Sequence, residues 1–530
     1  MDNLLSDSKL SISQYYEGRN IFVTGGTGFM GKILLEKLLR SCPGIDKIYV
    51  LTRSKRGESP QNRIKEMLKG PLYKPLEAES PNILKKVIAI RGDVTEPNLG
   101  ISSIDEEIIT NSVSVIFHVA ATVKFDDELA NAIKMNVKGT QSMIELARKI
   151  SNLSSFVHVS TAYSHCYQSW NSKTKMEEKF YPMPMSKYNS YSPDELIAIY
   201  EDAKSDGHDK TKDILGVFPN TYVFTKAWAE NVVMQSGQGL PIVMMRPSIV
   251  TAAWKEPVAG WVDNLNGPTG ILAAAGVGLM QTMYAKRYKR ADLIPVDIAC
   301  NMLCVLAWKA GNTLSQGQKI DIYNCTSGES APVTWGHVEK AMGYFTTKYP
   351  LENMIWYPYA CSNGILHPLK NNKLADRVCR ILFHWLPAYV IDMVCYMARV
   401  KNVSRVKLTE KMTKAMKVLE YFSTKEWYWD TKNVGLLYDT VHDTDKKVFS
   451  FTFQEFEGWD QYLENTIKGT REFAMKSDPT TIDNCKSRLK KFYISHQVLK
   501  IMLLAMFYLL LCRIFGNFFT ELKMENSVEK

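Results

Sequence analysis

Residues 24–31 of this chain read TGGTGFMG, and this stretch decides the fold that the sequence predicts. It follows a short apolar run at 21–23 and opens onto a segment, 33–39, whose leucines and isoleucine recur at helical spacing. A strand, a glycine-rich turn and a helix in this order are typical of a dinucleotide site, because the N–H groups at the start of the helix face the phosphates. The flanking strand and helix carry this prediction, since a bare glycine triplet also occurs in ordinary turns.

Each glycine of the turn has a separate expected task. Gly25 permits a tight turn, Gly28 lets a pyrophosphate approach the backbone, and Gly31 lets the helix pack closely against the strand. Thr27, Phe29 and Met30 lie between these glycines and complete the expected phosphate-binding set.

Composition places the chain among globular proteins of more than one domain. It has 530 residues, of which 45% are hydrophobic and 23% are charged, and its net charge is +10. This basic balance suits an anionic cofactor, an anionic substrate or an anionic membrane face. We expect no nucleic-acid partner and no metal site, because the 10 scattered cysteines form no CxxC pair and no zinc-finger spacing occurs. The simplest interpretation is a reduced, cytosol-facing catalytic portion.

The first half of the chain alternates short apolar runs with helical segments. After the first strand, strands are expected at 47–52, 87–90, 114–121, 156–160 and 242–245. A helix is expected over 128–150. This alternation predicts an α/β fold of the Rossmann type, with a doubly wound parallel sheet whose ligands bind beyond the carboxyl ends of its strands.

The second half is expected to be mainly helical. Residues 251–345 are rich in Gly, Pro and Trp and predict an irregular substrate-side region with helices. In the unit 355–465, the stretch 381–400 is apolar but interrupted by polar residues, so we interpret it as a buried or membrane-surface helix pair. Residues 466–495 are polar and predict a basic linker.

The C-terminal segment 496–519 is predicted to be a transmembrane helix. Its apolar residues number roughly 20, about the length that crosses a bilayer. A basic cluster precedes it and places the large N-terminal portion in the cytosol: Lys486, Arg488, Lys490 and Lys491. A buried or interfacial helix is the alternative, because Arg513 interrupts the apolar run.

Residues at the ends of the predicted strands indicate which dinucleotide binds. Arg53 follows the second strand, where a guanidinium accommodates a 2′-phosphate, and this favours NADPH over NADH. Asp93 and Val94 follow the third strand, where the carboxylate either accepts from the adenine amino group or bonds its own turn. Ala120 and Ala121 end the fourth strand, and their small side chains let a cofactor lie against the backbone.

The catalytic candidates are Tyr222 and Lys226, four residues apart on one helix face. A nearby ammonium is expected to lower the pKa of the phenol, which otherwise lies near 10, so that Tyr222 can donate a proton as hydride reaches a carbonyl carbon. Lys226 can also hold the nicotinamide ribose. Ser160 and Thr161 end the fifth strand, where one hydroxyl can bond the reacting oxygen.

Two further segments are candidates for ligand contact. Ile249 lies just beyond the sixth strand, in a stretch, 246–250, whose backbone can meet the nicotinamide carboxamide. The basic run 286–290 either contacts anionic phosphates or is a solvated face.

With these residues assembled, nearly the whole chain resembles the extended short-chain dehydrogenase/reductases, and more closely the eukaryotic fatty acyl-CoA reductases, insect members in particular. The matching segments are TGGTGFMG at 24–31, FHVAATVKFD at 117–126, FVHVSTAY at 156–163, PNTYVFTKAWAE at 219–230, RPSIVTAAWKEPVAGWVDNLNGPTG at 246–270, IPVD at 294–297 and YFSTKEWYWDTKNV at 421–434. The 246–270 segment is the most specific, because general reductases of this superfamily do not carry it.

The resemblance implies an oxidoreductase that converts long-chain fatty acyl-CoA to a primary fatty alcohol with NADPH, through a bound aldehyde and with release of CoA. It implies an NADPH-binding catalytic domain over 15–345, a family-specific C-terminal domain over 355–465, and Thr161 rather than Ser160 as the catalytic hydroxyl. A membrane-anchored enzyme at the endoplasmic reticulum or the peroxisome is expected. Two alternatives stay open: a related reductase of another lipid or sterol carbonyl, and a cofactor-binding membrane protein without turnover. Oligomeric state and acyl chain length are also open.

Overall fold

The structure is a computed structural model, and it describes residues 10–55, 57–168, 173–188, 190–313, 319–358, 372–399 and 404–528. Seven parallel strands form one sheet in the order β3-β2-β1-β4-β5-β6-β9. Their bounds are β1 Asn20–Thr24, β2 Lys47–Thr52, β3 Val87–Arg91, β4 Val113–His118, β5 Ser155–Val159, β6 Ile242–Pro247 and β9 Asp321–Cys325. The strand order reverses between β1 and β4, so the crevice for a ligand lies beyond the carboxyl ends of these strands.

The predicted Rossmann-type sheet is therefore confirmed, with two differences. β4 ends at His118, three residues before the predicted end at 121, because the chain leaves the ladder at Val119 toward the glycine turn. β9 was not predicted, because Asp321 and Asn324 interrupt its apolar pattern. A second, two-stranded parallel sheet pairs β7 (Ile249–Thr251) with β8 (Leu293–Pro295).

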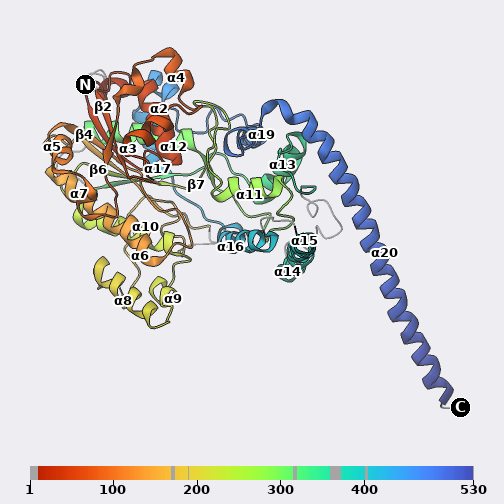
Figure 1. The fold of residues 1–530 in the computed structure, drawn as a ribbon. Helices are drawn as coiled ribbons and strands as arrows, with labels where there is room; N and C mark the ends of the chain where they lie inside the picture. Colours follow the sequence, from red (N-terminus) through yellow and green to blue (C-terminus); the bar gives the residue numbers. More distant parts are fainter. Residues whose placement is uncertain are drawn as a thin grey trace.

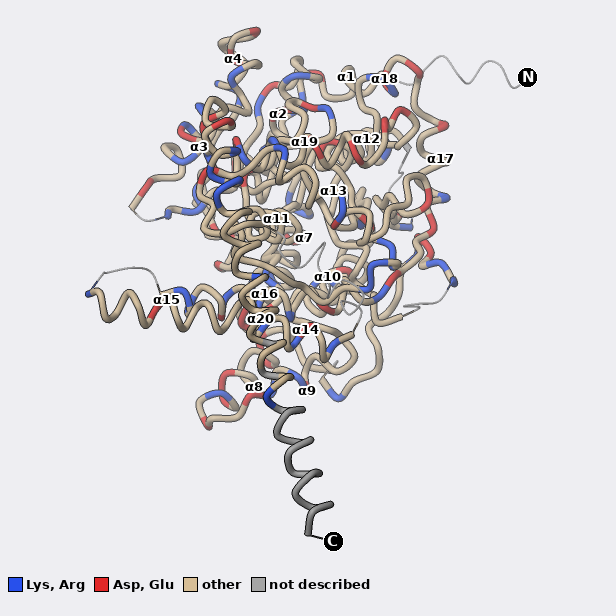
Figure 2. The backbone as a smooth tube through the Cα atoms, turned by 90° about the vertical axis from the view of Figure 1, so that its right-hand side faces the viewer, with Lys and Arg blue, Asp and Glu red and all other residues tan. Residues whose placement is uncertain are grey.

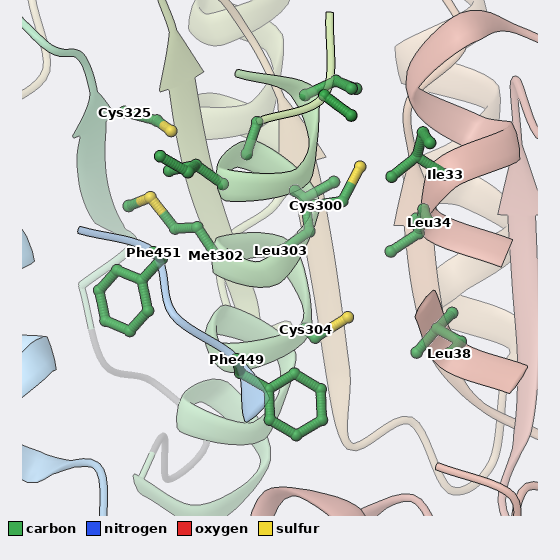
Figure 3. Packing of buried hydrophobic residues seen from close by; sticks show 14 of the residues in the cluster. Ile33, Leu34, Leu38, Cys300, Met302, Leu303, Cys304, Cys325, Phe449 and Phe451 are labelled. Carbon is green, nitrogen blue, oxygen red and sulfur yellow. The ribbon is translucent and has the colours of Figure 1, made fainter. Parts of the chain in front are cut away.

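Helices cover both faces of the main sheet (Figure 1). On one face α2 (Phe29–Ser41) packs against α12 (Val296–Thr313). Figure 3 shows the apolar side chains of this contact, Ile33, Leu34 and Leu38 opposite Cys300, Leu303 and Cys304. On the other face the core is formed with α5 (Ser103–Ser112), α7 (Gly139–Lys149) and α10 (Thr221–Ser236). These packed layers hold the strand ends rigidly.

The remaining helices of the N-terminal part surround this sandwich. The predicted helix over 128–150 is present as α6 (Leu129–Ala132), a π-helical turn η3 (Ile133–Lys138) and α7. The others are α1 Ile12–Tyr15, α3 Pro60–Leu68, α4 Lys74–Glu79, η1 Ile83–Lys86, η2 Pro97–Gly100, α8 Pro193–Ser205, α9 Thr211–Leu215, α11 Gly267–Gly276 and α13 Trp335–Lys348.

The C-terminal region is helical, as predicted, but its parts differ from the expectation. The stretch interpreted as a helix pair is one helical run formed by α14 (Lys373–Arg380), η5 (Ile381–Trp385) and α15 (Leu386–Met397). Pro387 lies in the first turn of α15, where a helix tolerates proline. The other helices here are α16 Arg405–Thr424, α17 Lys432–Thr440, α18 Asp443–Val448, α19 Trp459–Gly469, η6 Thr470–Ala474, η7 Pro479–Thr481 and α20 Ile482–Val528.

Much of the expected linker 466–495 is helical as well, because η6 continues α19 and α20 already begins at Ile482. α20 leaves the body as one long helix (Figure 1). Among the described residues, two helical segments, 373–397 and 479–513, are long and apolar enough to cross a membrane.

Candidate active site

The glycine turn between β1 and α2 has the shape of a phosphate cradle. Gly25 has a φ of +73°, and a Cβ there would lie 2.7 Å from the backbone nitrogen of Ala120. A Cβ on Gly31 would overlap the carbonyl group of Gly25. Gly28 precedes α2 and makes no side-chain cap, so it leaves the N–H groups at the helix start to a ligand. The turn thus fits the pyrophosphate of a dinucleotide.

The tryptophan-rich segment lies against the start of α2. The rings of Phe29 and Trp261 are stacked, with centroids 5.6 Å apart and an interplanar angle of 11°. Lys32 of α2 forms an ion pair with Asp263. Thr27 lies in the glycine turn and Met30 in the first turn of α2. The tryptophan-rich segment 246–270 therefore borders the predicted cofactor loop.

A buried carboxylate explains how the tryptophan-rich segment keeps its shape. Asp297 accepts backbone N–H groups from Trp254 at 2.9 Å, from Lys255 at 2.7 Å and from Glu256 at 3.0 Å. The motif IPVD was recognised in the sequence, but this structural role of its aspartate was not, because the partners lie 41 to 43 residues earlier.

The end of β4 meets the glycine turn through backbone atoms. The N–H of Ala120 donates to the hydroxyl of Thr24 at 3.3 Å, and that hydroxyl is also bonded to Nδ1 of His118 at 2.8 Å. Ala120 and Ala121 are both half-buried. Their small side chains leave the backbone beside the turn open to a flat group.

Arg53 and Asp93 lie together at the ends of the neighbouring strands β2 and β3. The Arg53 guanidinium is 3.5 Å from Oδ2 of Asp93, and more than half of the arginine side chain is exposed. Oδ1 of Asp93 accepts from the N–H and the hydroxyl of Thr95, at 3.0 and 2.9 Å. Asp93 therefore bonds its own turn, one of the two roles expected for it, while Val94 is buried in the core.

Tyr222 and Thr161 are brought together by α10 and the end of β5. The Thr161 hydroxyl lies close enough to the phenol to affect its pKa, and it also donates to the carbonyl of Pro247 at 3.4 Å. The surrounding protein withdraws the phenol from water and raises its pKa to about 12, although Thr161 lowers it. The expected lowering of this pKa below 10 is thus wrong for the protein alone, because desolvation outweighs the effect of Thr161.

Lys226 lies one helical turn from Tyr222 and is buried. Its ammonium donates to the carbonyl oxygen of Val159, the last residue of β5, at 2.6 Å. Burial lowers the pKa of Lys226 to about 8, and the charge of Glu230 opposes this shift. The ammonium is therefore fixed at the same strand end that carries Ser160 and Thr161.

The structure separates the two adjacent hydroxyls. Ser160 donates to Oε1 of Glu230 at 2.5 Å, away from Tyr222. Arg246 of β6 binds both carboxylate oxygens, with Nε 2.9 Å from Oε1 and Nη2 2.6 Å from Oε2. Two more side chains bind the same carboxylate: the Ser164 hydroxyl lies 2.9 Å from Oε1 and Nε2 of His165 lies 3.1 Å from Oε2.

This cluster stabilises the ionised form of Glu230, which is fully buried. Burial opposes ionisation, but the charge of Arg246 and the bonds from His165 and Arg246 hold the pKa of Glu230 well below its usual range. Sequence reasoning missed Glu230, although it lies four residues after Lys226 and ends the quoted segment PNTYVFTKAWAE.

Sequence reasoning also missed Asn136, which lies in the π-helical turn η3. Its amide donates to the hydroxyl of Thr225 at 2.9 Å, and its carbonyl oxygen accepts from the N–H of Thr122 at 2.9 Å. Asn136 thus links the catalytic helix α10 to the loop after β4. Single π turns of this kind occur frequently at functional sites.

The last two sequence candidates differ in their surroundings. Ile249 is half-buried in β7, and its N–H donates to the carbonyl of Asp292 at 3.2 Å. In the basic run 286–290, Arg287 pairs with Glu339 at 3.0 Å and Lys289 with Glu426 at 2.8 Å. These two cations therefore stabilise the fold. Over the described parts of the chain, no group of three His, Cys, Asp or Glu side chains is arranged to hold a metal.

Comparison with known proteins identifies relatives over most of the chain. Two family models, each described as male sterility protein, match residues 23–303 and 383–477, and the first is an NAD-binding model. Fatty acyl-CoA reductase 1 of Rattus norvegicus is 40% identical over 487 residues, which cover 91% of this chain and 90% of the relative. Fatty acyl-CoA reductase wat of Drosophila melanogaster is 34% identical over 512 residues, covering 96% and 93%.

A solved structure shares the fold. The terminal R domain of the myxalamid PKS-NRPS biosynthetic pathway aligns with a TM-score of 0.51 and 18% identity, covering 86% of this chain and 90% of that domain. At this identity the likeness concerns the fold alone.

Proposed function

This chain belongs to the fatty acyl-CoA reductase family, and from that premise we propose that it reduces long-chain fatty acyl-CoA with NADPH to a primary fatty alcohol. The reaction passes through a bound aldehyde and releases CoA. The observation that carries the proposal is the pairing of Tyr222 with Thr161 at the end of β5, with the buried Lys226 one helical turn away. Thr161 follows β5, one strand away from β1 and its glycine turn, with β4 between them.

We assign the cofactor contacts by position. The turn of Gly25, Gly28 and Gly31 holds the pyrophosphate, and Thr27, Phe29 and Met30 flank it. Arg53 meets the 2′-phosphate, which is the reason to propose NADPH. The adenine lies by Asp93 and Val94, and the nicotinamide half lies along Ala120, Ala121, Ile249 and Lys226.

When bound, NADPH would supply hydride to the carbonyl carbon, and two NADPH molecules would be used in turn, one for the thioester and one for the aldehyde. The hydroxyls of Thr161 and Tyr222 stabilise the negative charge that develops on the carbonyl oxygen. Because the pKa of Tyr222 is raised to about 12, its phenol stays protonated at neutral pH and can donate that proton to oxygen. The same two hydroxyls serve the thioester carbonyl first and the aldehyde carbonyl second.

The ammonium of Lys226 has a positioning and electrostatic role in this proposal. Below about pH 8 it is cationic, which favours the phenolate left on Tyr222 after proton transfer. Its bond to the carbonyl of Val159 keeps it beside the catalytic strand end.

The proposal includes membrane attachment through α20. Among its described apolar side chains, those of Tyr493, Ile494 and most of the segment 498–509 are exposed, with an exposed fraction of 66% at Ile501, and basic residues precede them. By the positive-inside rule the catalytic portion faces the cytosol, at the endoplasmic reticulum or peroxisome membrane.

The test compares the wild-type chain with Tyr222→Phe in membranes supplied with NADPH or NADH and acyl-CoAs of several chain lengths. We expect fatty alcohol with NADPH, and a loss of about 10²- to 10⁴-fold in turnover in the variant with NADPH binding kept. Product from the variant at the wild-type rate would refute the role of Tyr222. Turnover of a sterol or another lipid carbonyl, but of no acyl-CoA, would refute the substrate.

A further inference from the structure

In the helical run 373–397, two polar side chains are buried against the body while many apolar side chains are exposed. The side chains that face the body include Asp376 and His384, which are 2% and 3% exposed. Asp376 accepts from the hydroxyl of Thr282 at 3.3 Å, and His384 accepts the backbone N–H of Gln281 at 2.8 Å. These two polar groups bond the run to the body, and the other buried residues of the run, Cys379 and Ala388, have small side chains.

The outward side of the same run is apolar. Six of its exposed residues, each between 46% and 65% exposed, are Leu382, Leu386, Val390, Met393, Val394 and Met397. A continuous apolar surface of this kind marks a site of contact with another apolar phase.

The run is bonded to the body near its start and to the beginning of α16 near its end, and it runs across the direction of α20, so it lies along the bilayer that α20 enters (Figure 1 and Figure 2). Near its start, Asp376 is bonded to Thr282. Near its end, Asp392 accepts from the N–H of Arg405 at 2.7 Å and from the hydroxyl of Ser404 at 2.6 Å, at the beginning of α16. α16 then returns to the body, where Ser423 donates to the carbonyl of Tyr284 at 3.1 Å.

The neighbouring helix α16 supplies positive charge beside this apolar surface. It exposes four lysines spaced three or four residues apart, Lys407, Lys411, Lys414 and Lys417. Figure 2 shows α15 projecting from the body beside α16, close to the point where α20 passes. An apolar helix flanked by lysines matches the acyl and headgroup layers of an anionic membrane.

We infer that the run 373–397 lies in the boundary between headgroups and acyl chains of the same bilayer that α20 enters. The lysines of α16 face anionic headgroups there. Figure 1 shows α14 and α15 on the side of the body along which α20 runs, so one bilayer can receive both. The protein then has two membrane contacts, and the second orients the catalytic body, which α20 alone would leave free to rotate.

The test uses the full chain in vesicles of phosphatidylcholine and phosphatidylserine that contain a trace of phospholipid with a diazirine in its acyl chain. After photolysis, peptide mapping should find label in 381–397 as well as in α20, and none in α5. Label confined to α20 would overturn the inference. Crosslinks joining 381–397 of two copies, in place of lipid label, would show a second copy as the occupant and would also overturn it.

A matched pair of variants separates lipid contact from folding. The triple variant Leu382→Gln, Val390→Gln and Met393→Gln should lose most label in 381–397 while α20 keeps its label. The control changes three exposed apolar residues elsewhere, Ile104→Gln, Val217→Gln and Leu436→Gln, which are 73%, 57% and 58% exposed, and should label like wild type. Equal label in the two variants would overturn the inference. Equal label in vesicles of phosphatidylcholine alone would overturn the role of the α16 lysines.

Discussion

The tandem hydroxyls Ser160 and Thr161 give a sharp test of the proposed chemistry, because the structure assigns them different partners. The Thr161 hydroxyl acts on the phenol of Tyr222, whereas Ser160 donates to Glu230 at 2.5 Å. We therefore expect Thr161→Val to reduce turnover and Ser160→Ala to reduce stability. The two substitutions each remove one hydroxyl at adjacent positions, so each serves as the control for the other.

The magnitudes follow from what each hydroxyl touches. Loss of one donor to a developing oxyanion costs about 10²- to 10³-fold in kcat, and this is the range expected for Thr161→Val. Ser160→Ala removes one of five hydrogen bonds to Glu230, since Arg246 supplies two and Ser164 and His165 one each. A hydrogen bond to a charged group contributes about 1.5–3 kcal/mol, so the free energy of unfolding should fall by that amount.

The assay measures kcat for fatty alcohol formation and the denaturant midpoint for both variants and for Thr161→Ser. Thr161→Ser should recover most of the turnover that Thr161→Val loses, because it keeps the hydroxyl. Thr161→Val also leaves the N–H of Tyr163 without the hydroxyl that accepts it at 3.3 Å, so a small loss of stability is expected. A large loss of kcat in Ser160→Ala at unchanged stability, with Thr161→Val fully active, would refute the assignment.

Three further predictions follow from the cofactor side of the site. Gly31→Ala should cost about 1–3 kcal/mol of stability and weaken NADPH binding, because its Cβ would overlap the carbonyl of Gly25. The control Gly435→Ala has open space around its Cβ inside α17, so it should raise stability by about 0.5–1 kcal/mol and leave NADPH binding unchanged, as measured by thermal unfolding and NADPH titration. Arg53→Ala should weaken NADPH more than NADH in a binding titration, and an unchanged ratio would dismiss the 2′-phosphate contact. Burial lowers the pKa of Lys226 to about 8, so its cation is present below that pH and turnover should fall as the pH rises through about 8. Lys226→Arg keeps the positive charge and should move this decline to higher pH. A pH profile identical to that of the wild type would contradict the role of Lys226.

The sequence predicts local structure well where a strand is apolar along its whole length. β1, β2, β3, β5 and β6 lie within two residues of their expected bounds, because parallel strands are buried on both sides and read as continuous apolar runs. β9 lies at the sheet edge and carries two polar residues, so the same criterion could not find it.

Contacts between distant segments explain what the sequence could not predict at the site. Asp297 was noted only as part of a motif, yet it organises the backbone of residues 254–256. The pKa of Tyr222 was expected to fall, because the spacing of Tyr222 and Lys226 suggests a nearby charge but does not reveal the desolvation that raises this pKa. The exposure of the apolar run 373–397 is likewise a property of packing and not of its composition.

The helical repeat of α10 places three side chains of the candidate site on one face. Tyr222, Lys226 and Glu230 are spaced four residues apart, so each lies one turn beyond the last. Glu230 is fixed by Arg246 of β6 and by groups that follow β5, and this bond holds the register of α10 against both strands. Since a displacement of about 1 Å can cost about 10²-fold in rate, we expect the buried ion pair to serve the proposed chemistry by fixing where Tyr222 meets Thr161, although it touches neither. Burying the ion pair of Glu230 and Arg246 costs free energy, and in return it fixes the position of Tyr222, the proposed proton donor.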